Sequence, residues 1–267
     1  MAGLQLPGQT VLLTGATGGI GSAIAKALHA GGASLILTGR RSEVLESVAS
    51  ELGERAEVVV ADLTDRDDVR GLCERATSAD VVVANAALPA SGRIEDFSPE
   101  EIDRALEVNL RTPIQLARAA APAMAERGSG HLVFVSSLSG KVASPGSGLY
   151  SATKFGVRAF AAALRQDLHG TGVGVTTVFP GFVGGAGMFA EADVKLPRGV
   201  GTVTPEQVAE AVVKGIERDK GEIDVAPLGL RAGALVAAVS PGLSARVQRK
   251  AGTELSAAIA EGQADKR

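Results

Sequence analysis

Near its amino terminus the chain reads Val11-Leu12-Leu13-Thr14-Gly15-Ala16-Thr17-Gly18-Gly19-Ile20-Gly21. The apolar run up to Thr14 is typical of a strand covered on both faces. Glycines permit a tight turn and let backbone amides approach a pyrophosphate, and the dipole of a following helix favours an anion. We therefore expect a strand, a phosphate-binding turn and a helix. The residues expected to contact a dinucleotide are Gly15, Thr17, Gly18, Gly19, Ile20 and Gly21, although a plain turn is the alternative for this motif alone.

Short β-branched runs alternate with longer helical patterns along the rest of the chain. Strands are expected near 11–14, 34–38, 57–60, 80–84, 131–136, 173–179 and 222–225, and helices near 20–31, 42–52, 65–77, 99–127, 149–169 and 205–218. This alternation predicts an α/β fold with right-handed βαβ units and a parallel sheet. Pro113 lies within the longest helical stretch, where we expect it to kink the helix. Without a repeat or linker, residues 1–267 are expected to form one domain.

Composition excludes several classes of function. The chain is 45% hydrophobic and carries a formal net charge of −3, so we expect a large core and no nucleic-acid or membrane partner for the molecule as a whole. Cys73 is the single cysteine, and the three histidines are scattered, so we expect no disulfide and no metal site. No signal-peptide pattern or membrane-spanning apolar run is visible, and we expect a cytoplasmic protein.

Residues that follow the second, third and fourth strands suggest how a dinucleotide is held. The second strand ends in Gly39-Arg40-Arg41, where enzymes that prefer NAD place an acid. A guanidinium can grip a 2′-phosphate, so Arg40 and Arg41 favour NADP(H) over NAD; the alternative is that both begin a solvated helix. Asp62 with Leu63, and Asn85 with Ala86, are expected either to contact the adenosine half or to form strand-end turns.

Tyr150 and Lys154 lie four residues apart, which places both side chains on one face of a helix. A nearby ammonium and an oxidised nicotinamide would lower the pKa of the Tyr150 phenol towards working pH, where acid/base catalysis is efficient. Ser137, at the end of the fifth strand, could hydrogen-bond a reacting carbonyl oxygen or simply form a turn. Asn109 could reach a backbone carbonyl or a water near Lys154, or face solvent.

In order and spacing these motifs resemble the short-chain dehydrogenase/reductase family. The resemblance rests on Thr14-Gly15-x-x-x-Gly19-x-Gly21, Asp62, Asn85-Ala86-Ala87, Asn109, Ser137, Tyr150-x-x-x-Lys154 and Pro180-Gly181, and spans about residues 8–226. It implies a doubly wound, Rossmann-like sheet of about seven parallel strands. It also implies Tyr150 as acid/base, Ser137 as carbonyl anchor, Lys154 on the nicotinamide ribose and Asn109 on a proton-relay water. Pro180, Gly181 and Val183 would lie against the nicotinamide. We also expect the protein to form a homo-oligomer, either a dimer or a tetramer.

Three features depart from the family pattern. The fourth-strand motif reads Ala84-Asn85-Ala86-Ala87 instead of Asn-Asn-Ala-Gly, and Gly185 stands where a threonine often contacts the carboxamide. A C-terminal extension of about residues 227–267, expected to be helical, follows the usual core. Its apolar and basic residues would cover the substrate pocket, build a subunit interface or lie on a membrane surface.

These observations favour an NADP(H)-dependent enzyme that transfers hydride between cofactor and a carbonyl or alcohol. Apolar residues of the 182–203 segment (Phe182, Met188, Phe189 and Leu196) favour a lipophilic small-molecule substrate. The alternatives are a non-catalytic dinucleotide-binding protein and a membrane-peripheral interaction protein.

Overall fold

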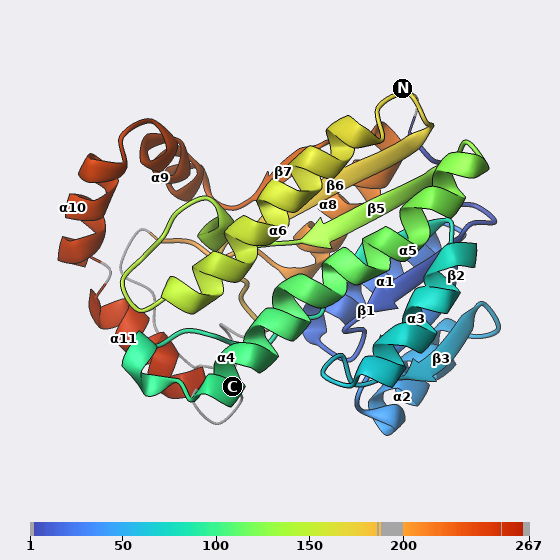
Figure 1. Cartoon of the computed structure of the whole chain (residues 1–267), viewed down its shortest axis with the longest axis horizontal. Coiled ribbons are helices and arrows are strands. Elements are labelled where there is room, and N and C mark those ends of the chain that lie inside the picture. The colour runs from blue at the N-terminus through green and yellow to red at the C-terminus, as the bar shows by residue number, and fades with distance from the viewer. Residues whose placement is uncertain (1–2, 186, 188–199, 252, 264–267) are drawn as a thin grey trace.

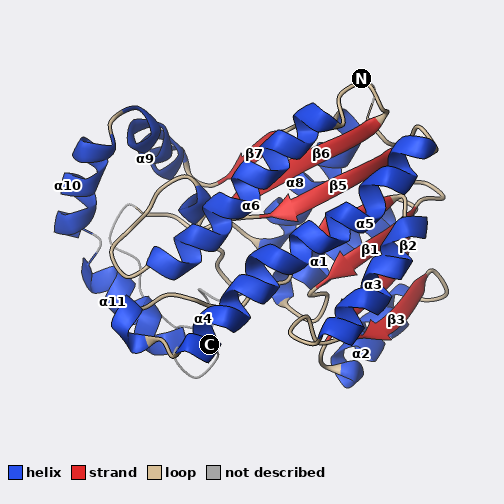
Figure 2. Ribbon diagram, viewed as in Figure 1, coloured by secondary structure: helices blue, strands red, loops and turns tan. Residues whose placement is uncertain are grey.

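A computed structural model describes residues 3–185, 187, 200–251 and 253–263. Seven parallel strands form its central sheet in the order β3-β2-β1-β4-β5-β6-β7 (Figures 1 and 2). The strands are β1 (Thr10–Thr14), β2 (Ser34–Gly39), β3 (Ala56–Val60), β4 (Val81–Ala84), β5 (Gly130–Val135), β6 (Val173–Pro180) and β7 (Glu222–Val225). The predicted doubly wound sheet is confirmed.

The helices follow the strands in alternation. They are α1 (Gly19–Ala30), α2 (Ser42–Leu52), α3 (Arg66–Ser78), α4 (Pro99–Leu106), α5 (Thr112–Glu126), α6 (Gly148–Asp167), α8 (Pro205–Arg218), α9 (Leu228–Val239), α10 (Pro241–Ala251) and α11 (Thr253–Gln263). Side chains cap three of them, because Asp65, Ser98 and Thr204 accept hydrogen bonds from first-turn amides of α3, α4 and α8. The helical C-terminal extension is confirmed by α9, α10 and α11.

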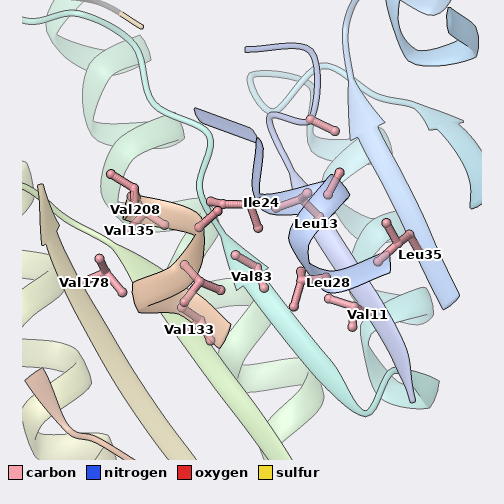
Figure 3. Packing of buried hydrophobic residues seen from close by; sticks show 14 of the residues in the cluster. Val11, Leu13, Ile24, Leu28, Leu35, Val83, Val133, Val135, Val178 and Val208 are labelled. Carbon is pink, nitrogen blue, oxygen red and sulfur yellow. The ribbon is translucent and has the colours of Figure 1, made fainter. Parts of the chain in front are cut away.

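The sheet buries apolar side chains on both faces. Val11 and Leu13 of β1 belong to the core on the side of α1 and α8, whereas Leu12 belongs to the core on the side of α3, α5 and α6. Figure 3 shows Ile24 of α1 and Val208 of α8 among the strand side chains of the first core. Burial on both faces explains why the strands are apolar throughout instead of alternating.

The helix expected over 99–127 is present from Pro99 to Glu126, but it is not α-helical throughout. The chain forms α4, then a π-helical turn, η2 (Glu107–Arg111), and then α5. Pro113 follows this turn directly, in the first turn of α5, and the residues before it, Arg111 and Thr112, have α-helical φ and ψ; the expected kink at Pro113 stays a prediction. The irregular turn is centred on Asn109, and such π-turns are frequent at functional sites.

The carboxyl ends of the strands all lie at one edge of the sheet. The chain winds outward in opposite directions from β1 and β4, which makes the gap between their carboxyl ends the switch point where α/β proteins bind ligands. Beyond this edge stand α9, α10 and α11 (Figure 1). Among the described residues, no helix has both the length and the apolar character to cross a bilayer.

Candidate active site

The turn between β1 and α1 leaves the first amides of α1 without a side-chain cap, whereas the amides of Ala16 and Gly18 donate to the carbonyls of Thr38 (3.1 Å) and Gly15 (3.2 Å). Gly15 has a φ of 70°, and a Cβ on Gly21 would collide with the Gly15 carbonyl, so both positions require glycine. Gly18 is the N-cap of α1 and has no side chain to cap the helix, and the first turn carries no acid. The first amides of α1 and the helix dipole are therefore free to receive an anion such as a pyrophosphate.

Thr14 and Asn85 fix this turn to the end of β4. The Thr14 Oγ1 accepts hydrogen bonds from the amides of Asn85 (3.0 Å) and Ala86 (3.1 Å). In return, the Asn85 Nδ2 donates to the carbonyls of Thr14 (3.0 Å) and Gly15 (3.3 Å). Asn85 thus shapes the turn through its side chain. Sequence reasoning did not assign the bridging role of Thr14, although a hydroxyl residue at a strand end beside a glycine turn is the available signal.

A cavity of ≈ 220 Å³ lies between the carboxyl ends of β1, β2, β3 and β4. Its lining includes the predicted residues Gly15, Thr17, Gly18, Gly19, Ile20, Gly21, Arg40, Arg41, Asp62, Leu63, Asn85 and Ala86. It also includes residues that the sequence did not indicate: Thr38, Gly39, Ala61, Thr64, Ala87, Leu88, Val108 and Gly187. Thr38 Oγ1 is buried and has no hydrogen-bond partner within the described part of the chain, as expected for a group that faces a ligand.

Arg40 and Arg41 occupy different positions on the rim of this cavity. The Arg41 Nη2 donates to the carbonyl of Thr17 at 2.7 Å, so this guanidinium reinforces the glycine-rich turn. Arg40 is exposed at the end of β2 and precedes α2. The cavity therefore fits a dinucleotide, with amides for its pyrophosphate and an exposed guanidinium beside its ribose.

Asp62 forms a strand-end turn and also lines the cavity; its contact with adenosine stays a prediction. Its Oδ1 accepts hydrogen bonds from the amide and the hydroxyl of Thr64, both at 2.9 Å, which is a turn-forming arrangement. It also lines the cavity, together with Leu63. The helix cap itself is Asp65.

Ser137, Tyr150 and Lys154 come together at the carboxyl end of β5. Tyr150 and Lys154 are one turn apart on α6, and the Lys154 Nζ lies 5.6 Å from the centre of the Tyr150 ring. That Nζ donates to the carbonyl of Val135 at 3.1 Å. The α6 backbone approaches so closely that a Cβ on Gly140 would lie 2.8 Å from the Lys154 carbonyl oxygen. The Ser137 hydroxyl is hydrogen-bonded to the Tyr150 phenol and also accepts from the Ser139 amide at 3.1 Å.

Burial controls the protonation of this pair. It raises the pKa of Tyr150 to about 12, and the hydrogen bond from Ser137 acts in the opposite direction with a smaller effect. Burial also lowers the pKa of Lys154 to about 8, because this ammonium is only 3% exposed. Without a cofactor the pKa of Tyr150 is thus raised, because desolvation outweighs the hydrogen bond to Ser137; the lowering predicted from sequence included the charge of an oxidised nicotinamide. A lowered pKa requires the positive ring of a bound oxidised cofactor.

Asn109 joins the π-helical turn to the segment that follows β4. Its Oδ1 accepts from the amide of Leu88 at 2.6 Å, and its Nδ2 donates to the carbonyl of Leu88 at 2.9 Å. The side chain is 1% exposed, so the possibility that it faces solvent is wrong. Leu88 lines the cavity, and the amide of Tyr150 donates to the carbonyl of Ala90 at 3.2 Å. The 85–90 segment thus connects the cavity with the Ser137–Tyr150–Lys154 group.

The last predicted residues lie at the end of β6 and outside the cavity lining. Pro180 ends the strand, the Gly181 amide donates to the carbonyl of Val225 at 2.9 Å, and a Cβ on Gly181 would lie 3.6 Å from the Leu138 Cδ1. Val183 pairs with Val203, which brings together the two ends of the segment between them. Met188, Phe189 and Leu196, expected to be part of a substrate loop, lie outside the described residues. Ser137, Tyr150, Lys154 and Asn109 are likewise not part of the cavity lining.

The parallel sheet, the uncapped glycine turn at its switch point and the adjacent tyrosine–lysine pair define a nucleotide-binding oxidoreductase of the Rossmann type. The model of the short chain dehydrogenase family matches residues 9–196, and the chain belongs to this family.

Similar proteins support this assignment. The ketoacyl reductase HetN of Nostoc sp. (strain PCC 7120) is 35% identical over 227 residues, which are 82% of this chain and 79% of that protein. An uncharacterized oxidoreductase of Staphylococcus aureus (strain USA300) is 35% identical over 234 residues, 84% of this chain and 99% of that one. A short-chain dehydrogenase from Sphingobium yanoikuyae, solved in complex with NADPH, superposes with a TM-score of 0.77 at 27% identity, covering 88% of this chain and 95% of that one.

Proposed function

We propose that this protein is an NADP(H)-dependent enzyme that reduces the carbonyl group of a lipophilic small molecule, with Tyr150 as the proton donor. The observation that carries the proposal is the meeting of Tyr150, Ser137 and Lys154 at the end of β5, next to the dinucleotide cavity. Three polar groups from the end of β5 and from α6, two of them with pKa values shifted by burial, mark a site for acid/base chemistry.

Each group has a role that its position supports. The bound cofactor supplies hydride to the carbonyl carbon. The Tyr150 Oη donates its proton to the carbonyl oxygen, and the Ser137 hydroxyl hydrogen-bonds the same oxygen, which becomes more negative as the reaction proceeds. Lys154 Nζ is held by the Val135 carbonyl close to the phenol, where its charge favours the phenolate left after proton donation. Asn109 keeps the 85–90 segment in place and supports a relay water that returns the proton.

The protonation of Tyr150 favours the reductive direction. With a pKa of about 12, the phenol carries its proton at neutral pH and is ready to donate it. Oxidation of an alcohol would need the phenolate, and therefore a cofactor ring whose positive charge overcomes the effect of burial.

Two observations favour NADP(H). Arg40 is an exposed guanidinium on the cavity rim, at the place where an acid would hold the 2′-hydroxyl of NAD. In addition, the Sphingobium relative was solved with NADPH, and HetN is described as a ketoacyl reductase. An acyl chain bearing a ketone is consistent with the lipophilic substrate expected from the 182–203 segment.

The Tyr150→Phe variant tests the proposal. We expect it to bind NADPH as the wild type does but to lower kcat for ketone reduction by about 10²–10⁴-fold, because only the proton donor is lost. Stopped-assay NADPH oxidation and fluorescence titration of NADPH measure the two quantities. Ser137→Ala should also lower kcat, whereas Ser139→Ala, a neighbour on the same short 3₁₀ turn, is the matched control and should retain it. Undiminished turnover in Tyr150→Phe would exclude the assigned role.

Three further expectations complete the proposal: one folding domain, a homo-oligomer and a cytoplasmic location. A single cooperative unfolding transition, light scattering and cell fractionation test them in turn.

A further inference from the structure

The outer face of α9 exposes most of the large apolar side chains of the helix. Leu228, Ala232, Leu235 and Val239, spaced i, i+4, i+7 and i+11, form one stripe along the helix and are all exposed. Leu228 and Val239 are each 79% exposed and Leu235 is 68% exposed. The buried position of α9 is the small Ala234. Packing within one chain places large apolar side chains inward, so this reversed arrangement calls for an external partner.

The inner face of α9 is attached to the proposed active site. A Cβ on Gly181, at the end of β6, would lie 3.6 Å from the Leu230 Cδ1 of α9 and 3.6 Å from the Leu138 Cδ1. Leu138 directly follows Ser137. The helix therefore presents one side to the end of β6 and the opposite, apolar side to the surroundings. Figure 1 shows α9 and α10 projecting from the end of the molecule at which the strands terminate.

Helix α10 continues the same kind of surface. Its Leu243 is 51% exposed, and the Ser144 hydroxyl donates to its Gln248 Oε1 at 3.3 Å, which attaches α10 to the loop before α6. Between Asp224 and Glu254 the sequence contains no acidic residue, but it contains four basic ones: Arg231, Arg246, Arg249 and Lys250. Arg231 and Arg246 are exposed. The region of α9 and α10 is therefore positive, although the net charge of the whole chain is −3.

We propose that α9 and α10 form a docking surface for an anionic lipid bilayer. Exposed leucine and valine side chains enter the boundary between headgroups and acyl chains, while Arg231 and Arg246 meet lipid phosphates. With 12 residues, α9 is about 18 Å long, well short of the hydrocarbon thickness, so it lies in the plane of the membrane.

A second copy of the chain fits this surface less well than a bilayer does. In a two-fold symmetric contact the same patch meets itself, which would bring the arginines of both copies together with no acid from residues 225–253 to neutralise them. The expectation from sequence that the molecule has no membrane partner rested on net charge, which averages over the whole surface and hides this local excess.

Vesicle co-sedimentation of the full chain tests the assignment. Wild-type protein should bind phosphatidylcholine vesicles that contain about 30% phosphatidylglycerol, and binding should weaken without the anionic lipid or in high salt. The combined Leu228→Ser, Leu235→Ser and Val239→Ser variant should lower the partition coefficient about tenfold or more, since three exposed apolar groups are lost. Val60→Ser with Ile94→Ser removes exposed apolar side chains elsewhere and should leave binding unchanged.

A second variant tests the charges. Arg231→Gln with Arg246→Gln should remove the preference for anionic vesicles and keep the residual binding to neutral ones. Wild-type protein that stays in the supernatant, or a serine variant that binds equally well, overturns the proposal. A wild-type dimer that the serine variant converts to monomer, with no vesicle binding by either, overturns it in favour of a subunit interface. Reduction of a water-soluble ketone without vesicles should be equal in all variants, so loss of vesicle binding leaves the proposed enzymatic function intact.

Discussion

Replacing Lys154 by methionine should make the protein more stable while it destroys the proposed activity. Lys154 is a buried ammonium, and its Nζ donates a hydrogen bond to the carbonyl of Val135. Methionine has a similar volume and no charge, so it removes the desolvation cost and keeps the packing.

The expected gain can be calculated from the pKa. Burial lowers the pKa of Lys154 from 10.5 to about 8, which corresponds to a cost of about 3 kcal/mol at neutral pH. The methionine cannot donate to the Val135 carbonyl, which is then left without this hydrogen bond, and that loss offsets about 1.5 kcal/mol of the gain. The variant should therefore be about 2 kcal/mol more stable at pH 7, with a Tm higher by about 4–8 °C.

The pH dependence gives a second signature. Because the folded pKa lies below the unfolded one, the unfolded wild type binds more protons between pH 8 and 10.5, and its free energy of unfolding rises with pH in this window. Relative to the variant, the wild type should gain about 2.5 kcal/mol from pH 7 to pH 10, where the two stabilities meet. The raised pKa of Cys73 affects both proteins in the same way and cancels in the difference.

Urea unfolding followed by far-ultraviolet circular dichroism measures the effect. NADPH is left out, because a bound ligand would add its own stabilisation. Lys141→Met is the control: Lys141 pairs with Glu222 (2.9 Å) and Asp224 (2.6 Å), so its loss should destabilise the protein. A Lys154→Met variant less stable than wild type at pH 7, or a difference that persists at pH 10, would refute the argument.

Three other substitutions address the cofactor site. Arg40→Ala should weaken NADPH binding by about 10–100-fold and leave NADH binding unchanged, whereas Arg41→Ala should weaken the binding of both cofactors because Arg41 supports the glycine-rich turn. Fluorescence titrations measure the affinities, and an equal loss for NADPH and NADH in Arg40→Ala contradicts a contact with the 2′-phosphate. Gly21→Ala should abolish binding of either dinucleotide in equilibrium dialysis, because the added methyl collides with the turn; intact binding would show that the turn can adapt. Asn109→Ala removes both hydrogen bonds to Leu88, so it should lower the free energy of unfolding by about 1–3 kcal/mol and should also lower kcat. If the free energy of unfolding and kcat both stay unchanged, Asn109 has no positioning role.

Local sequence was sufficient for the fold class. Apolar runs bounded by helical patterns predicted the strands, and the exact bounds of β7 (Glu222–Val225) followed from its short run. The glycines near Thr14 predicted the turn, and the four-residue spacing placed Tyr150 and Lys154 on one helix face. These features depend on backbone freedom and on periodicity, which neighbouring residues determine.

Long-range contacts decided what the sequence could not. The π-helical turn within the predicted 99–127 helix places Asn109 where its side chain pairs with the backbone of Leu88, 21 residues earlier. The Thr14 hydroxyl meets the amide of Asn85, 71 residues later. The direction of the Tyr150 pKa shift follows from burial, and only the packed structure shows which face of α9 remains outside. Desolvation and packing depend on residues that are distant along the chain, whereas turns and helix faces depend on those that are adjacent.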